Sequence, residues 1–213
     1  MKVNIAELDA ILFTFFWTDI GSIKRHLEQG NRGAFTDNTD IAPMLNLEYA
    51  YKPNPLRATF FEAGQNACIM FPNLQYGWQS LVGRIKQAMQ IKSCYIRIMD
   101  DKKMLMPSNC LCYSEGRSKR TVYAQKEKRW VFADAGTPLF FETPQYYESK
   151  QIKARLNKKI LLEYCERLGV SKSGAIDLCQ DSAFSYEAYW EGKFADCKGR
   201  GPTSLRRKAL KED

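Results

Sequence analysis

Two segments of the chain repeat apolar residues with the period of a helix, so each is expected to pack one face against a core. Within residues 77–90 the apolar side chains recur three or four positions apart, at Trp78, Leu81, Val82, Ile85, Ala88 and Met89. Residues 150–168 keep the same spacing and are followed by Gly169, which suits the left-handed residue that ends many helices. The pattern therefore predicts two principal amphipathic helices.

The N-terminal residues 5–29 also look helical. Asp19 is expected to cap a separate helical segment over residues 20–27, because a carboxylate accepts hydrogen bonds from the free N–H groups of a first turn. Residues 30–46 are rich in Asn, Asp and Gly, a composition typical of an exposed loop.

Shorter apolar runs bounded by turn residues predict β-strands. The tripeptide Lys126-Glu127-Lys128 separates two of these runs and suits a hairpin turn. The expected strands lie at 47–51, 58–61, 68–71, 94–99 and 104–106, with an antiparallel meander over 110–142. The predicted fold class is therefore α+β: an antiparallel sheet of hairpins, packed with the two helices and a small helical C-terminal piece.

The same pattern divides the chain into three parts. We expect an α+β core over residues 1–149 and a helical C-terminal segment over 150–192 that packs on this core. Residues 193–213 are rich in Gly and basic residues and poor in apolar ones, which predicts a mobile basic tail.

Residues 161–173 resemble the first helix and turn of a helix-turn-helix motif. Cys165, Gly169, Val170 and Ser171 occupy its small, turn, hydrophobic and capping positions. A recognition helix over 172–180 would carry acidic residues that phosphates repel. We therefore favour an ordinary helix that ends at Gly169, followed by a short acidic helix.

Composition excludes several classes of protein. The 213 residues are 45% apolar and 13% aromatic, enough to bury a core. The longest apolar run, Ile11 to Trp17, is far shorter than the ~20 residues of a bilayer-spanning helix. Glu7 and Asp9 precede this run, which argues against a signal peptide. We expect a cytoplasmic protein with no membrane partner.

Basic residues are concentrated in the middle of the chain. Residues 84–129 hold 12 Lys and Arg against 4 Asp and Glu, a net charge of +8 that equals the net charge of the whole protein. Such a block favours an anionic partner, either nucleic acid (RNA or DNA) or an acidic protein surface, although it can also be a solvated face that serves only solubility. Interleaved aromatic residues favour nucleic acid, because bases stack on aromatic rings.

The leading hypothesis is a non-enzymatic protein that binds nucleic acid through phosphate contacts, alone or as a subunit of a nucleoprotein complex. The alternative is an inhibitor or immunity-type protein that covers an acidic partner surface. Tyr123 and Trp130 are the expected stacking platforms. The expected phosphate-binding residues are Arg84, Lys86, Arg97, Lys102, Lys103, Arg117, Lys119, Arg120, Lys126, Lys128 and Arg129, with Arg206, Arg207 and Lys208 from the tail.

Few residues suggest catalysis. His26 is the only histidine, and the sequence has no phosphate-binding loop, dinucleotide-binding motif or nucleophile elbow. Cys110-Leu-Cys112 is the only tight pair among seven cysteines and lacks the second pair of a zinc knuckle, so we interpret it as alternate residues of one strand. We expect no cofactor and no metal. An enzyme with a carboxylate–metal or cysteine-dependent site is the third hypothesis.

Overall fold

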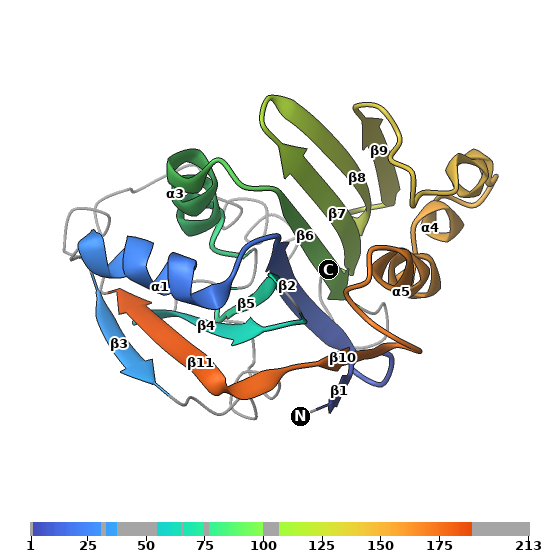
Figure 1. The fold of residues 1–213 in the computed structure, drawn as a ribbon. Helices are drawn as coiled ribbons and strands as arrows, with labels where there is room; N and C mark the ends of the chain where they lie inside the picture. Colours follow the sequence, from blue (N-terminus) through green and yellow to red (C-terminus); the bar gives the residue numbers. More distant parts are fainter. Residues whose placement is uncertain are drawn as a thin grey trace, which may run out of the picture.

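One large antiparallel sheet forms the framework of the protein (Figure 1). The computed structural model describes residues 2–30, 33–37, 55–64, 66–74, 77–99 and 107–188. The strands of the large sheet are β2 (Ala10–Phe16), β3 (Ala34–Asp37), β4 (Leu56–Glu62), β5 (Cys68–Pro72), β6 (Ser93–Met99), β7 (Ser108–Glu115), β8 (Ser118–Lys126), β9 (Trp130–Ala135) and β11 (Cys179–Ala188). Their order across the sheet is β3-β11-β4-β5-β2-β6-β7-β8-β9, and neighbouring strands are antiparallel.

The remaining elements complete an α+β fold, which confirms the predicted class. Two short strands, β1 (Lys2–Asn4) and β10 (Ala175–Asp177), pair with each other in a separate ribbon. The helices are α1 (Ile20–Gln29), α3 (Gln79–Met89), the 3-10 helix η1 (Pro144–Glu148), α4 (Ile152–Arg155) and α5 (Lys158–Arg167). None of the helices among the described residues is long and apolar enough to span a membrane.

Helices cover both faces of the sheet, and each face has its own core. α1 and α3 pack on one face, which we call the α1/α3 face, around buried residues such as Phe60 and Phe184. η1, α4 and α5 pack on the opposite face, the α4/α5 face, where Leu161 and Tyr164 are fully buried. Figure 1 shows the two helix groups over different halves of the sheet. Side chains on each strand alternate between these faces, as strand geometry requires.

The N-terminal apolar run is a central strand rather than a helix, so the prediction of helix over residues 5–19 is wrong. Ile11, Phe13 and Phe15 enter the core of the α4/α5 face, and Phe16 enters the core of the α1/α3 face. A strand buried on both faces is apolar at nearly every position, as β2 is apart from Thr14, and it loses the alternation that identifies half-buried strands. The separate helix α1 is confirmed, and Asp19 Oδ1 accepts a hydrogen bond from the Ser22 amide at 2.8 Å.

The predicted helix over residues 150–168 is interrupted after its first turn. Leu156 is extended with φ −145°, and Asn157 caps α5 by accepting a hydrogen bond from the Ile160 amide at 3.1 Å. Gly169 follows α5 with the left-handed φ of +72° expected from its sequence. The buried Leu156 side chain fixes this break, because its extended backbone places the side chain in the core.

No second helix follows α5 in residues 170–188, so both the helix-turn-helix motif and the short acidic helix are wrong. Ser173 and Gly174 both have positive φ and turn the chain into β10. β11 then enters the large sheet between β3 and β4. The C-terminal segment is thus helical only as far as α5, and its division from the core at residue 149 stays a prediction.

The other elements follow the predicted pattern closely. The strands at 58–61, 68–71 and 94–99, the helix over 77–90 and the hairpin at residues 126–128 are confirmed. β3 is an additional strand inside the predicted loop 30–46. The expected strands at 47–51 and 104–106 and the tail over 193–213 lie outside the described residues.

Candidate nucleic-acid interface

The basic block between residues 84 and 129 does not form one surface. Arg117 and Lys119 lie at one end of β8, in and beside the turn from β7. Lys128 and Arg129 lie in the turn at the other end, where β8 leads into β9. Nine residues of β8, at about 3.3 Å each, separate the two turns. The two groups of cations therefore lie at opposite ends of β8.

Lys86 and Lys119 form a pair of neighbouring cations on the α1/α3 face, which we call the lysine pair. Lys86 Nζ projects from α3 and donates a hydrogen bond to Ser114 Oγ on β7. Ser114 lies directly opposite Lys119 in the register of β7 and β8. Partial burial lowers the pKa of Lys86, and the positive charge of Lys119 lowers it further. The two ammonium groups are close enough to repel each other.

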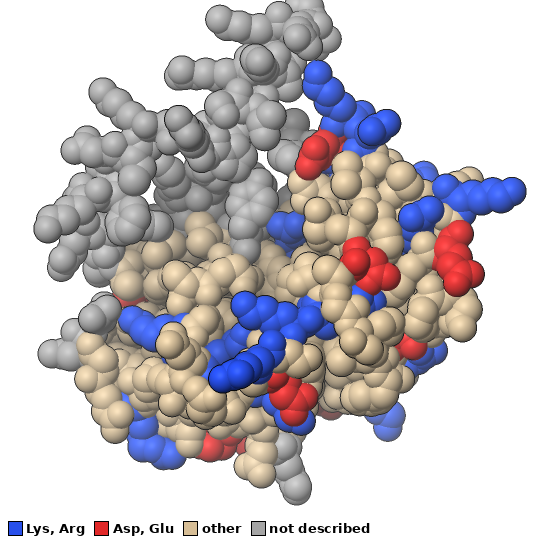
Figure 2. Space-filling view, turned by 90° about the horizontal axis from the view of Figure 1, so that it is seen from above, with Lys and Arg blue, Asp and Glu red and all other residues tan. Residues whose placement is uncertain are grey.

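The surroundings of the lysine pair add further positive charge. Arg117 is exposed in the adjoining turn between β7 and β8. Glu115, the acidic residue of that turn, is already engaged by Lys92 Nζ at 2.7 Å. Figure 2 shows Lys and Arg side chains gathered across the middle of the surface seen from above, with fewer Asp and Glu side chains between them.

A strip of polar residues continues from the lysine pair along the same face of the sheet. Because Lys119, Thr121 and Tyr123 are alternate residues of β8, their side chains share the α1/α3 face. Cys112 lies opposite Thr121, and Cys110 lies opposite Tyr123. Tyr123 is half-buried, so part of its ring is accessible beside the strip.

Arg97 lies at the buried end of this strip. It is opposite Cys110 in the register of β6 and β7, and only 8% of its surface is exposed. Its Nη2 lies 3.4 Å from Gln125 Oε1 and donates a hydrogen bond to it. With so little of its surface exposed, Arg97 contributes positive potential from beneath the strip rather than a direct phosphate contact.

Cys110 and Cys112 are alternate residues of β7, as predicted, and their Sγ atoms lie 3.5 Å apart. Either sulfur can be the donor in the hydrogen bond between them. The pKa of Cys112 falls to about 7, chiefly through this hydrogen bond to Cys110; the Thr121 hydroxyl and the Arg97 charge lower it further, against the effect of burial. The pKa of Cys110 rises for the complementary reasons, its hydrogen bond to Cys112 and its burial. No group of three or more metal-ligating residues occurs among the described residues.

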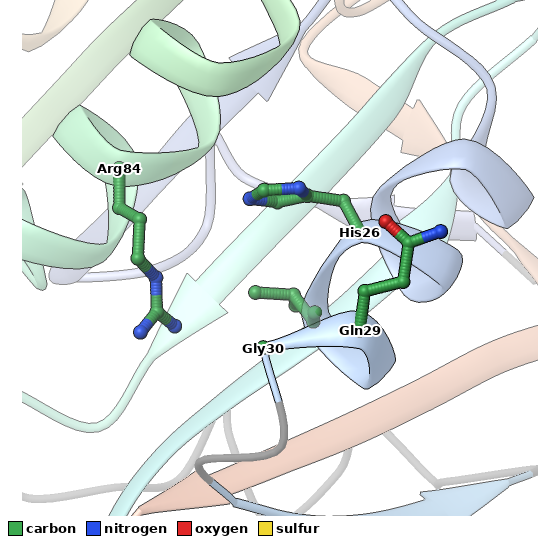
Figure 3. A pocket seen from close by; sticks show the side chains of 5 residues that line it. His26, Gln29, Gly30 and Arg84 are labelled. Atoms are coloured by element: carbon green, nitrogen blue, oxygen red, sulfur yellow. The ribbon is translucent and has the colours of Figure 1, made fainter.

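Arg84 lies on the opposite side of α3 from Lys86. Its Nη2 donates a hydrogen bond to the Tyr186 hydroxyl on β11 at 3.3 Å, and its guanidinium lies 6.0 Å from the centre of that ring. Arg84 also lines a hollow of about 340 Å³ with His26 and Gln29, which project from the C-terminal end of α1 (Figure 3). Arg84 is therefore separate from the lysine pair.

Arg120 is not available to a phosphate, and we withdraw it from the predicted interface. Its side chain is 1% exposed and points to the α4/α5 face. The guanidinium forms two ion pairs, one with Glu142 at 2.7 Å and one with Asp134. The sequence pattern already contains the signal that separates Arg120 from Lys119, since adjacent residues of a strand point to opposite faces.

The two predicted stacking residues also lie on opposite faces. Tyr123 packs beside the cysteines of the α1/α3 face, whereas Trp130 packs against the core of the α4/α5 face. They cannot form one platform. Lys126 is exposed and lies opposite Trp130 in the register of β8 and β9. The remaining predicted contacts, Lys102, Lys103, Arg206, Arg207 and Lys208, lie outside the described residues.

No known protein family matches this chain, and neither does any curated protein or solved structure. The candidate interface therefore rests on its own geometry: the lysine pair, Arg117 in the adjoining turn and Tyr123 on the same face of β8. Sequence reasoning missed the role of Ser114, whose position opposite Lys119 depends on the register of the hairpin.

Proposed function

We propose that the protein binds nucleic acid, with phosphate held between Lys86 and Lys119 on the α1/α3 face. The observation that carries this proposal is the repulsion within the lysine pair, which contributes to the lowered pKa of Lys86. A phosphate placed between two ammonium groups relieves their repulsion and releases condensed counterions from the nucleic acid. The hydrogen-bond partner of Lys86 is the neutral Ser114 hydroxyl, so an anion does not have to displace a carboxylate from it.

Tyr123 supplies the second half of the proposed interface. Its side chain follows Lys119 along the same face of β8, so a strand whose phosphate contacts the lysine pair can lay a base against the exposed part of the ring. Phosphate contacts and stacking carry little base identity, so binding is expected to be weakly selective for sequence. A cytoplasmic, non-enzymatic role, alone or within a nucleoprotein complex, belongs to the same proposal.

The test is fluorescence-polarisation binding of labelled single- and double-stranded oligonucleotides across a salt series, after nuclease treatment and high-salt purification. Wild type is compared with two double variants that each remove two positive charges, Lys86→Ala/Lys119→Ala and Lys128→Ala/Arg129→Ala. We expect steep salt dependence for wild type. The first variant should lower the slope of log affinity against log salt by about 1.4 for single strands, or about 1.8 for duplex, since two phosphates are no longer neutralised.

The Lys128/Arg129 variant is the matched control, because it removes the same charge from the far end of β8. It should retain most of the wild-type slope. An equal loss in both variants would contradict the assignment to the lysine pair and point to a diffuse effect of net charge. Flat binding curves for wild type at low salt would contradict the proposal and favour an acidic protein surface as the partner.

A further inference from the structure

The two thiols of β7 face each other on a single strand. Leu111 between them is fully buried toward the α4/α5 face, so Cys110 and Cys112 share the α1/α3 face with their Sγ atoms 3.5 Å apart. Two strand residues span about 6.6 Å between Cα atoms, which lies within the separations that disulfides bridge. The Cβ atoms of alternate strand residues are nearly as far apart as their Cα atoms, whereas a disulfide needs Cβ atoms about 3.5–4.5 Å apart, so bond formation requires a local bend of β7 as well as the approach of the sulfurs.

The environments of the two thiols differ in a way that assigns each a role. Cys112 is the more exposed of the two; it shares a hydrogen bond with the Cys110 thiol, in which either sulfur can be the donor, and it lies near the Thr121 hydroxyl and the Arg97 guanidinium. These groups stabilise a thiolate, and the pKa of Cys112 falls to about 7. Burial favours the protonated form of Cys110, so Cys110 is the donor when Cys112 is the thiolate. A nucleophile and an adjacent second thiol are thus held together.

The other buried cysteines lack these features. Cys68, Cys94 and Cys165 are fully buried in the two cores, and burial raises the pKa of each. Buried thiols of this kind are inert. Cys179 is exposed on β11, away from Cys112, and serves as an internal comparison for simple accessibility.

We propose that Cys110 and Cys112 form a dithiol switch that is oxidised by hydrogen peroxide, with Cys112 as the attacking thiolate and Cys110 as the resolving thiol. The Cys112 sulfur attacks one peroxide oxygen, the O–O bond breaks, and the leaving hydroxide takes a proton to become water. This gives a sulfenic acid on Cys112. Cys110 loses its proton and attacks the Cys112 sulfur, the S–O bond breaks, and a second water leaves. In total, two thiols are oxidised to one disulfide and one peroxide is reduced to two waters.

The switch is reversible, because thiolates of the cellular low-molecular-weight pool can attack the disulfide and regenerate both cysteines. A disulfide between alternate residues of a strand lies near the long end of the favourable Cα separations. Strained disulfides are the more easily reduced ones. The proposal is independent of nucleic-acid binding and goes beyond it.

The test exposes the folded full-length chain to hydrogen peroxide and maps the products by mass spectrometry, with dimedone to trap sulfenic acids. In wild type, the peptide that contains both Cys110 and Cys112 should lose the mass of two hydrogen atoms, and a thiol reductant should restore its original mass. Cys110→Ser should accumulate dimedone-reactive sulfenic acid at Cys112. Cys112→Ser should leave Cys110 reduced, and Cys179→Ser, the control, should behave as wild type.

A second measurement uses wild type alone, so that it does not depend on any variant folding. In the native protein at neutral pH, iodoacetamide should alkylate Cys112 faster than the more exposed Cys179, because the thiolate is the reactive species. Slower alkylation of Cys112 than of Cys179 would overturn its role as nucleophile. A wild-type product that holds sulfenic acid on Cys112 without a disulfide would overturn the role of Cys110.

Discussion

Lys119 and Arg120 are neighbours in β8, yet the fold gives their charges opposite surroundings. Lys119 is exposed on the α1/α3 face beside a second lysine. Arg120 is buried on the α4/α5 face, where its Nε lies 2.9 and 3.1 Å from the two carboxylate oxygens of Glu142. One cation is available to an anion from solution, and the other is already neutralised inside the protein.

The buried cation is the centre of a network that joins the sheet to the helices. Besides its two carboxylates, Arg120 donates to the backbone carbonyl of Gly136 at 2.9 Å. Glu142 also accepts from the Tyr147 hydroxyl at 2.7 Å, and Tyr164 in turn donates to the Tyr147 oxygen at 3.1 Å. Burial raises the pKa of Tyr147 and keeps its phenol protonated as a donor. Each charged group in this network therefore has a hydrogen-bonded partner of opposite charge, which buried ions require.

The contrast teaches that charge counts along a sequence do not separate structural cations from binding cations. A cation is structural when the fold places a carboxylate beside it in the core. For Arg120 this carboxylate is Glu142, which lies 22 positions later in the chain. Three predictions can break or sharpen this comparison.

The largest expected effect follows from removing the buried cation. Arg120→Met leaves Glu142 buried without its ion-pair partner, and breaking a buried pair in this way costs about 3–5 kcal/mol of unfolding free energy. Urea denaturation measures the loss. The neighbouring Lys119→Met should change the unfolding free energy by no more than about 0.5 kcal/mol, because its side chain is exposed.

The cause of that loss can be tested with a second substitution. Adding Glu142→Gln to Arg120→Met removes the buried unpaired charge and should recover part of the stability, whereas Asp134, which also loses its partner, is partly exposed. Equal stabilities for Arg120→Met and Lys119→Met would refute the distinction between the two faces.

An intermediate effect is expected at Gly136, whose carbonyl accepts a hydrogen bond from Arg120. Its φ is +89°, and a Cβ atom there would lie 2.3 Å from the Lys119 carbonyl oxygen. Gly136→Ala should therefore lower the unfolding free energy by more than about 1 kcal/mol, through both backbone strain and displacement of β8 from the network.

Gly116→Ala is the matched control for this prediction. Gly116 also has a positive φ, +54°, but a Cβ atom there meets nothing within 4 Å. It should show the backbone cost alone, about 1 kcal/mol. If thermal or urea denaturation ranks Gly116→Ala as the more damaging change, the close approach at Gly136 is not important.

The difference between local and long-range contacts also explains which parts of the fold the sequence predicts. The hairpin of β8 and β9 is local: alternating side chains and a polar turn define it within 18 residues, 118–135. β2 is defined only by its position in the folded protein, where β5 and β6 pair with its two edges and the cores on both sides of the sheet bury its two faces. Its apolar run, interrupted only by Thr14, fits a helix or a strand equally well, and only its pairing within the sheet decides.

The prediction of a helix within residues 172–188 is wrong for a related reason. β11 pairs with β4, more than a hundred positions earlier, so nothing near it in the chain indicates its partner. For the candidate interface, the period of two along β8 is sufficient to place Lys119 and Tyr123 on one face and Arg120 on the other. The approach of Lys86 to Lys119 is a tertiary contact between α3 and the hairpin, and it requires the folded structure.

The smallest expected effect is a change in the pKa of Lys86, which reports directly on the lysine pair. Because burial and the charge of Lys119 lower this pKa below its ordinary value, the unfolded chain binds more protons than the folded one just below pH 10.5. The unfolding free energy should therefore rise with pH across that window.

In Lys119→Met the repulsion is removed and burial alone remains, so the pKa of Lys86 should rise part of the way towards its ordinary value, and the slope of the unfolding free energy against pH should decrease. An NMR titration of the Lys86 side chain gives the pKa, and urea denaturation between pH 8 and 11 gives the slope. A pKa of Lys86 that does not move in Lys119→Met would mean that the two ammonium groups do not share a site, and a phosphate would then have no reason to bind between them.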